Sequence, residues 1–238
     1  MNIINEEAEL SELEFREEYD RLSVLASCGL RHIAAYAENL RQQQELVARS
    51  NQRPAFIIHA IYSRVKRIAS VRAKLQRKSL PLTVKNLRDL HDIAGIRIVT
   101  VFPDDIYRVR DALAKQLTIV AEKDYIKNPK SNGYRSLHLI VDTHVSFQDT
   151  AKSVLVEIQI RDLVMDMWSE LHHVLVYKRP KHHYDESDDD SATEVDEVAA
   201  TEVDEVAATY ESTDESFRKL NEVLITVDES AQKLYDTT

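Results

Sequence analysis

The ten residues Ile93–Phe102, IAGIRIVTVF, form a nearly unbroken apolar and β-branched run. Such a run is typical of a strand that is buried on both faces, and such strands occur in sheets that helices cover on each side. Helical spacing follows directly after this run, where Ile106, Val109 and Leu113 fall on one face. The chain is therefore expected to fold as a mixed α/β domain, with further helices towards both ends.

Periodicity and turn signals place the other elements. Three glycines and five prolines are too few for the many turns of an all-β barrel. Gly29 is expected to separate two helices. The expected helices cover residues 6–26, 30–49, 55–77, 162–176 and 217–235, with a short helical turn at 87–90, and the expected strands cover 93–102, 118–122, 136–143 and 154–161.

Charge is distributed unevenly along the chain. The formal net charge is -10, but residues 185–215 contain 14 acidic residues and no Lys or Arg. Residues 1–184 contain 28 basic and 23 acidic residues, and residues 53–88 contain 10 basic residues and no Asp or Glu. The basic stretch predicts an anionic partner such as nucleotide phosphates, nucleic acid or an acidic membrane surface, and the alternative is a solvated basic helix face.

The acidic segment contains a tandem repeat, because residues 193–200 and 201–208 both read TEVDEVAA. A repeat this short and polar is expected to form a solvated linker rather than a solenoid. We therefore divide the chain into an N-terminal helical extension (1–50), a central domain (51–181), an acidic linker (182–215) and a C-terminal helix (216–238).

Several features predict a protein that is neither secreted nor embedded in a membrane. No apolar run approaches the roughly 18–20 residues that a membrane-spanning helix needs. The first residues, MNIINEE, lack the basic start and the apolar core of a signal peptide. Cys28 is the only cysteine, which excludes an intrachain disulfide and a cysteine-based zinc site. A cytoplasmic protein is expected.

The segment 154–161, VLVEIQIR, alternates strictly and is expected to be a strand with one apolar face. Polar side chains in a row on a central strand need polar partners, which predicts a pocket, and the alternative is an edge strand with one face in water. The apolar face carries Val154, Val156, Ile158 and Ile160, and the other face carries Leu155, Glu157, Gln159 and Arg161.

A second carboxylate, Asp92, lies just before the buried run 93–102. Carboxylates presented from neighbouring strands are a usual way to hold Mg²⁺, which prefers oxygen ligands and bridges phosphate oxygens. Alone, Asp92 is equally suited to a cap or a turn. Together with Glu157 it predicts a magnesium site.

Cationic groups gather in two places that suit phosphates. On a helix through residues 70–78, Ser70, Lys74 and Arg77 share one face, which matches a triphosphate. The loop 125–136 contains three cations, two tyrosines and Gly133, and a loop tyrosine can stack on a base. An ordinary surface loop is the alternative for this segment.

Four linked motifs resemble those of the RelA/SpoT-type alarmone synthetases, in particular the small single-domain (p)ppGpp synthetases. The motifs follow the family order and cover roughly residues 50 to 180. The resemblance implies a nucleotidyltransferase-like synthetase fold, a mixed β-sheet of about five strands flanked by helices, with N- and C-terminal helical extensions. The motifs read SRVK at 63–66 with Ser70 and Lys74, HDIAGIRI at 91–98, DYIKNPK at 124–130 with NGYRSLH at 132–138, and VEIQIR at 156–161.

The resemblance implies a GTP pyrophosphokinase of the stringent response, which transfers the β,γ-pyrophosphoryl group of ATP to the 3′-hydroxyl of GDP or GTP. Asp92 and Glu157 would bind Mg²⁺, and Glu157 would also take the proton of the 3′-hydroxyl. Arg64 and Arg97 would hold the adenine between them, and Tyr134 would stack on guanine. The ATP phosphates would contact Lys66, Ser70, Lys74 and Arg77, and the acceptor nucleotide would contact Lys130, Asn132, Tyr134, Arg135, His138, Gln159 and Arg161.

The resemblance also bears on assembly and on alternatives. Small synthetases generally form tetramers through their terminal helices, so a homotetramer is expected, and packing of the C-terminal helix on its own core is the alternative. The helix after the Glu157 strand usually ends in Glu-His in the family, whereas this chain has His172-His173. Two other functions stay open: a toxin-type synthetase that pyrophosphorylates the 3′ end of tRNA, and a nucleotide- or RNA-binding regulator without turnover.

Overall fold

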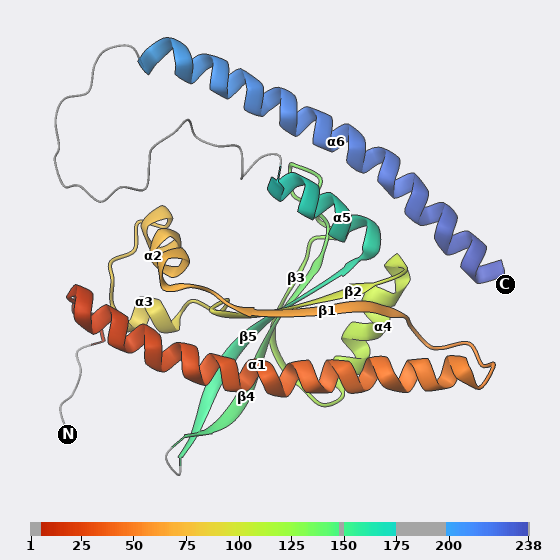
Figure 1. Cartoon of the computed structure of the whole chain (residues 1–238), viewed down its shortest axis with the longest axis horizontal. Helices are drawn as coiled ribbons and strands as arrows, with labels where there is room; N and C mark the ends of the chain where they lie inside the picture. The colour runs from red at the N-terminus through yellow and green to blue at the C-terminus, as the bar shows by residue number, and fades with distance from the viewer. Residues whose placement is uncertain (1–5, 148–149, 175–198, 238) are drawn as a thin grey trace. The chain divides into compact units, whose positions relative to one another are not determined.

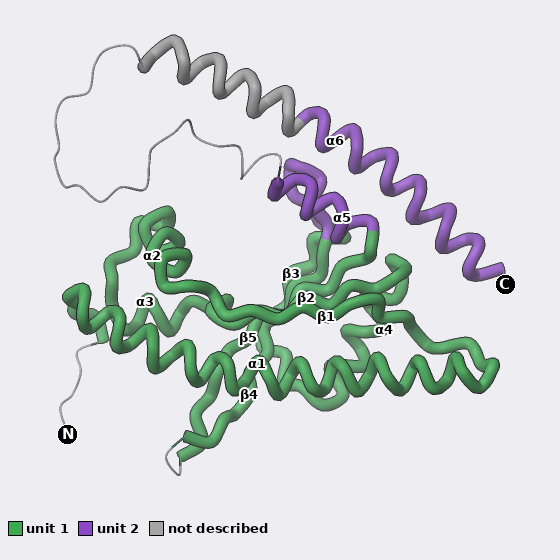
Figure 2. The backbone as a smooth tube through the Cα atoms, viewed as in Figure 1, with its two compact units in different colours: residues 1–127, 136–163 green, residues 128–135, 164–238 purple. Residues whose placement is uncertain are grey.

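The computed structural model describes residues 6–147, 150–174 and 199–237 of the chain, and these fall into two compact units (Figure 2). Unit 1 comprises residues 1–127 and 136–163, and unit 2 comprises residues 128–135 and 164–238. The first part of the expected acidic linker, residues 182–198, lies outside the described residues, and the expected domain boundaries stay predictions. Within the described ranges, no helix is both long enough and apolar enough to cross a membrane.

Unit 1 is built on a five-stranded sheet in the order β1-β2-β5-β4-β3. Only the β2–β5 pair is parallel, and the other neighbours are antiparallel. The buried run becomes the interior strand β2, which confirms the mixed α/β fold (Figure 1). The strands are β1 (Ile58–Val65), β2 (Ala94–Thr100), β3 (Thr118–Asp124), β4 (Leu137–Phe147) and β5 (Thr150–Asp162).

The two faces of the sheet have different chemistry, because β5 alternates as the sequence predicts. Val156, Ile158 and Ile160 are fully buried. Helices α1 (Glu12–Arg49) and α4 (Pro103–Ala114) pack beside each other, with the Tyr36 hydroxyl donating to the Ala112 carbonyl at 3.1 Å. The other face of β5 carries the polar side chains, among them Glu157 and Gln159.

The expected break at Gly29 is wrong, because α1 is one helix of 38 residues. Its start has a capping box, in which the Glu14 amide donates to Ser11 Oγ and the Ser11 amide donates to Glu14 Oε2. At Gly29 an added Cβ would lie 2.8 Å from Thr143 Cγ2 and 3.3 Å from Val154 Cγ1. The glycine therefore serves close approach of the helix to the sheet, and burial there outweighs its cost in a helix.

The expected helix 55–77 is also wrong in its first half. Residues 58–65 form β1, and the helix α2 covers only Ile68–Arg77. Pairing with β2 decides this, since Tyr62 lies opposite Arg97 and Arg64 lies opposite Gly95. The short helix α3 (Val84–Arg88) begins three residues before the expected helical turn at 87–90 and overlaps it only at 87–88. The strands predicted at 118–122, 136–143 and 154–161 are confirmed.

Unit 2 contains α5 (Leu163–His172) from Val164 onward, α6 (Ala199–Thr237) and the loop 128–135. Its own hydrophobic cluster consists of Met165, Trp168, Phe217 and Leu224. Helix α6 begins at the end of the first repeat copy and is longer than the predicted 217–235, which fits the high helix propensity of Ala and Glu in that repeat.

Candidate active site

Asp92 is the centre of a cationic cluster at the start of β2. Both Lys66 Nζ and Lys74 Nζ donate to Asp92 Oδ2, although Lys66 follows β1 and Lys74 lies on α2. Burial by itself would raise the pKa of Asp92, but the hydrogen bonds from the two lysines outweigh it and hold this pKa below its usual range. The carboxylate is therefore ionised at neutral pH.

The second carboxylate oxygen of Asp92 has a different environment from the first. Its Oδ1 is buried and accepts no hydrogen bond from any residue that the structure describes. A buried carboxylate oxygen in this condition costs free energy unless a ligand satisfies it.

Glu157 projects from the middle of β5 on the polar face. Gln159 Nε2 donates to Glu157 Oε2 at 2.7 Å, and His138 Nδ1 lies 3.3 Å from Glu157 Oε1. Burial opposes ionisation of Glu157, yet the contacts with His138 and Gln159 together leave its pKa below its usual range. The pair His138–Gln159 therefore keeps a half-buried carboxylate charged.

The two carboxylates interact electrostatically. The negative charge of Asp92 acts on Glu157 in the direction that raises its pKa. Register explains the approach: Gly95 lies opposite Glu157 in the parallel β2–β5 pair, and Asp92 is three residues before Gly95. Gly95 adds no side chain beside Glu157, and even an added Cβ there would have no contact closer than 3.9 Å.

Pairing across four strands lines up the predicted residues in two rows on this face. Residues directly opposite each other in a sheet point to the same side. One row runs Arg64–Gly95–Glu157, and the next runs Tyr62–Arg97–Gln159–His138. The sheet therefore gathers residues predicted for the donor and the acceptor nucleotide onto one polar surface.

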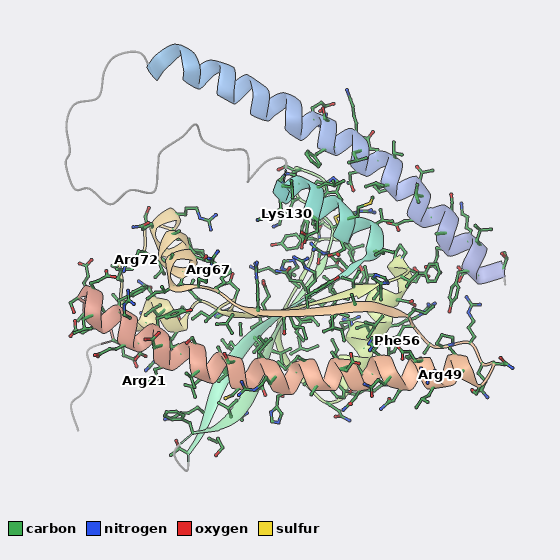
Figure 3. The ribbon with its side chains drawn as sticks, in the orientation of Figure 1. Arg21, Arg49, Phe56, Arg67, Arg72 and Lys130 are labelled. Carbon is green, nitrogen blue, oxygen red and sulfur yellow. The ribbon has the colours of Figure 1, made fainter. Side chains whose placement is uncertain are left out.

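The other predicted residues of unit 1 lie in different settings. Arg161 continues the polar face of β5 but is only 2% exposed. Ser70 and Arg77 are exposed on α2. The neighbouring Arg72, labelled in Figure 3, is anchored to α1, because it pairs with Glu12 and its guanidinium lies 5.1 Å from the centre of the Phe15 ring.

Four predicted acceptor residues belong to unit 2: Lys130, Asn132, Tyr134 and Arg135. They form a tight turn in which the Gly133 amide donates to the Lys130 carbonyl at 2.8 Å and the Tyr134 amide donates to Asn132 Oδ1 at 3.2 Å. Lys130 Nζ, labelled in Figure 3, lies 4.9 Å from the centre of the Tyr134 ring. The loop thus presents a cation and an aromatic ring side by side.

Sequence reasoning assigned no individual role to two aromatic residues of unit 1, Tyr62 and Tyr125. The Arg97 guanidinium lies 5.9 Å from the centre of the Tyr62 ring, and the ring centres of Tyr125 and His138 are 5.1 Å apart, edge to face. The local sequence around Tyr62 predicts a helix, so only the register of β1 against β2 shows that Tyr62 lies beside Arg97. Tyr125 lies within the DYIKNPK motif, and that motif is the signal that could have found it.

One cavity of unit 1 lies away from these residues. It has a volume of about 930 Å³ and lies between α1 and the adjoining ends of β4 and β5. Leu22, Lys152 and Leu155 are among its lining residues, and none of the predicted site residues lines it.

Comparison with known proteins agrees with the motifs. A family model described as "Region found in RelA / SpoT proteins" matches residues 63–182, which include Asp92, Glu157 and the loop between them. The chain belongs to the RelA/SpoT family.

Two curated members of the family come from Bacillus subtilis. The GTP pyrophosphokinase YwaC is 47% identical over 119 residues, 49% of this chain, and the GTP pyrophosphokinase YjbM is 44% identical over 123 residues, 51% of this chain. In each comparison the matched region spans 57% of the relative's own length.

Solved structures extend the similarity beyond the motifs. Small alarmone synthetase 1 from Bacillus subtilis, in a crystal structure with its product pppGpp, superposes with a TM-score of 0.71 at 27% identity. That match covers 93% of this chain and 98% of the other chain. The five-stranded fold with its helical ends is therefore a family fold.

Proposed function

We propose that this protein transfers the β,γ-pyrophosphoryl group of ATP to the 3′-hydroxyl of GDP or GTP and so makes the alarmones ppGpp and pppGpp. Membership of the RelA/SpoT family supports this, as do relatives named GTP pyrophosphokinase and a structural relative bound to pppGpp. The observation that carries the proposal is the position of Glu157 on the polar face of the sheet, opposite Gly95 of β2, which closely follows the lysine-bound Asp92.

Glu157 suits the role of general base in this transfer. Its lowered pKa means that the proton-accepting form dominates at neutral pH. In the proposed step the 3′-hydroxyl proton passes to the Glu157 carboxylate while the 3′-oxygen bonds to the β-phosphorus. The bond from the β-phosphorus to the oxygen bridging the α-phosphorus breaks, and AMP leaves.

Lys66 and Lys74 are proposed to hold the phosphates of ATP. Each ammonium group has three N–H donors and gives one to Asp92, so others stay available for phosphate oxygens. Ser70 and Arg77 are proposed to add further contacts to the phosphates. Arg64 and Arg97 are proposed to hold the adenine between their two guanidinium groups. Positioning and charge neutralisation supply most of the rate enhancement in such transfers.

The donor set fits Mg²⁺, which we propose as the cofactor. The buried Oδ1 of Asp92 lacks a partner among the described residues, and Glu157 adds a second ionised carboxylate. When bound, Mg²⁺ would neutralise charge on the transferred phosphates. Asp92 and Glu157 would be its protein ligands.

Assembly and location follow from the same proposal. Helix α6 exposes an apolar stripe in which Val223, Val227 and Leu234 are 61%, 49% and 70% exposed. We propose that a second copy of the chain covers this stripe in a homo-oligomer, a tetramer by resemblance to the small synthetases. A cytoplasmic location is proposed because ATP and GTP are the substrates.

Incubation with radiolabelled ATP and Mg²⁺ tests the activity, with GDP, GTP or tRNA offered in parallel. We expect labelled ppGpp from GDP and pppGpp from GTP, and no label on tRNA. Transfer to tRNA alone would support the toxin-type function instead. No transfer to any acceptor would refute an enzymatic function.

A further inference from the structure

The buried face of α6 is unusual because two of its four residues are polar. Phe217, Asn221, Leu224 and Asp228 follow a spacing of four, three and four residues, which forms one helix face. Asn221 is 5% exposed and Asp228 is 3% exposed. Polar side chains buried to this extent need specific partners, and both find them in the loop 128–135.

Asn221 forms a hydrogen bond with the backbone of the loop at Gly133. Its Nδ2 donates to the Gly133 carbonyl at 2.9 Å. Gly133 has a φ of 86°, and an added Cβ would lie 2.6 Å from Asn221 Nδ2. The asparagine side chain therefore occupies the space that any other residue at 133 would need.

Asp228 holds the loop seven residues further along α6. Its Oδ2 lies 3.6 Å from Arg135 Nη2, and the two side chains are 5% and 18% exposed. Removal of either charge would leave its partner less well compensated in a poorly solvated place.

Aromatic contacts also link α5, α6 and the loop 128–135. Trp168 Nε1 donates to the Phe217 carbonyl at 3.1 Å, and the two rings meet edge to face with centres 5.8 Å apart. The Tyr134 ring centre is 6.4 Å from that of Trp168. His172, the departure from the family pattern, stacks on Trp168 with ring centres 4.9 Å apart.

We propose that α6 is the anchor of the acceptor loop, and that Asn221 and Asp228 are positioning residues that set the affinity for the guanine nucleotide. They act through Gly133 and Arg135, which flank Tyr134. The inference rests on the proposed function and deepens it, since it identifies Arg135 as a structural link to α6 rather than a direct nucleotide contact. A loop that is already ordered loses less conformational entropy when it binds its ligand.

Steady-state kinetics of N221A and D228N test the proposal. Loss of a hydrogen bond or of a charged partner should raise the KM for GDP roughly fivefold to tenfold, while the KM for ATP changes less than about twofold. Glu222 and Glu229 are exposed neighbours on α6, so E222A and E229Q are matched controls and should behave as the wild type. Equal effects on both nucleotides, or none, would overturn the proposal.

A second measurement needs no turnover. Hydrogen exchange of a peptide covering residues 128–135 in the nucleotide-free full chain should be faster in N221A than in E222A. Trp168 is the only tryptophan, so its fluorescence reports on the same contact and can follow GDP titrations. G133A should raise the dissociation constant for GDP in the wild type but add less in N221A, because both changes disrupt one contact.

These measurements separate the two proposals. If no acceptor is pyrophosphorylated but GDP still binds more weakly to N221A than to E222A, the enzymatic function fails and the anchor stands. If transfer proceeds normally in N221A and D228N and loop exchange is unchanged, the anchor is refuted and the function stands. Absence of binding of both GDP and GTP to the wild type would overturn both proposals.

Discussion

Replacement of Glu157 by glutamine tests whether its carboxylate performs chemistry or only completes the fold. The Glu157 side chain is 19% exposed and contacts Gln159 and His138 at 2.7 and 3.3 Å. The amide has nearly the same size but is neither a base nor an anionic ligand. We expect E157Q to lower kcat by roughly 10³, within the range that loss of a general base causes.

The same substitution should hardly change stability. Burial and the charge of Asp92 oppose ionisation of Glu157, whereas the contacts with His138 and Gln159 favour it. These contributions have opposite signs, so their removal together should change the free energy of unfolding by less than about 1 kcal/mol.

Transfer from labelled ATP to GDP and unfolding in urea, measured on one preparation, separate the two effects. Glu222 is exposed on α6, and E222Q is the matched carboxyl-to-amide control. It should keep both activity and stability. Turnover of E157Q within about tenfold of the wild type would refute a chemical role, because a lost base costs more than this.

Further predictions concern pH, the metal and the packing of α1. Despite burial, hydrogen bonds hold the pKa values of Asp92 and Glu157 below normal, so the stability they confer is present above about pH 4 and is lost as the pH falls through the lowered values. K74M removes one of the two lysines that bind Asp92. The free energy of unfolding in urea should therefore fall less between neutral and acidic pH in K74M than in the wild type. Chelation of Mg²⁺ should abolish transfer of label from ATP, and added Mg²⁺ should restore it. G29A should lower the free energy of unfolding in urea by about 1–3 kcal/mol through its clash with Thr143, and T143S should recover part of it.

Much of the sheet could be predicted from local pattern. The buried strand β2 and the alternating strand β5 follow from short-range hydrophobic pattern, which depends only on neighbouring residues. The alternation by itself also places Glu157 and Gln159 on one face of β5. The motifs identified the family because they are long and in order.

Local pattern failed where tertiary contacts outweigh propensity. Residues 58–65 look helical beside the basic segment that follows, but pairing with β2 makes them a strand. Gly29 should interrupt a helix, yet α1 continues because the small residue allows contact with β4 and β5.

The sequence alone determined which side chains can carry the chemistry, since charge and alternation are properties of the chain itself. Only the tertiary structure decided which of them meet: Lys66 and Lys74 at Asp92, His138 at Glu157, and Asn221 at Gly133. Such pairs lie far apart in the sequence, and their contact depends on strand register and helix docking. No local pattern encodes these, because they arise from the packing of the whole core.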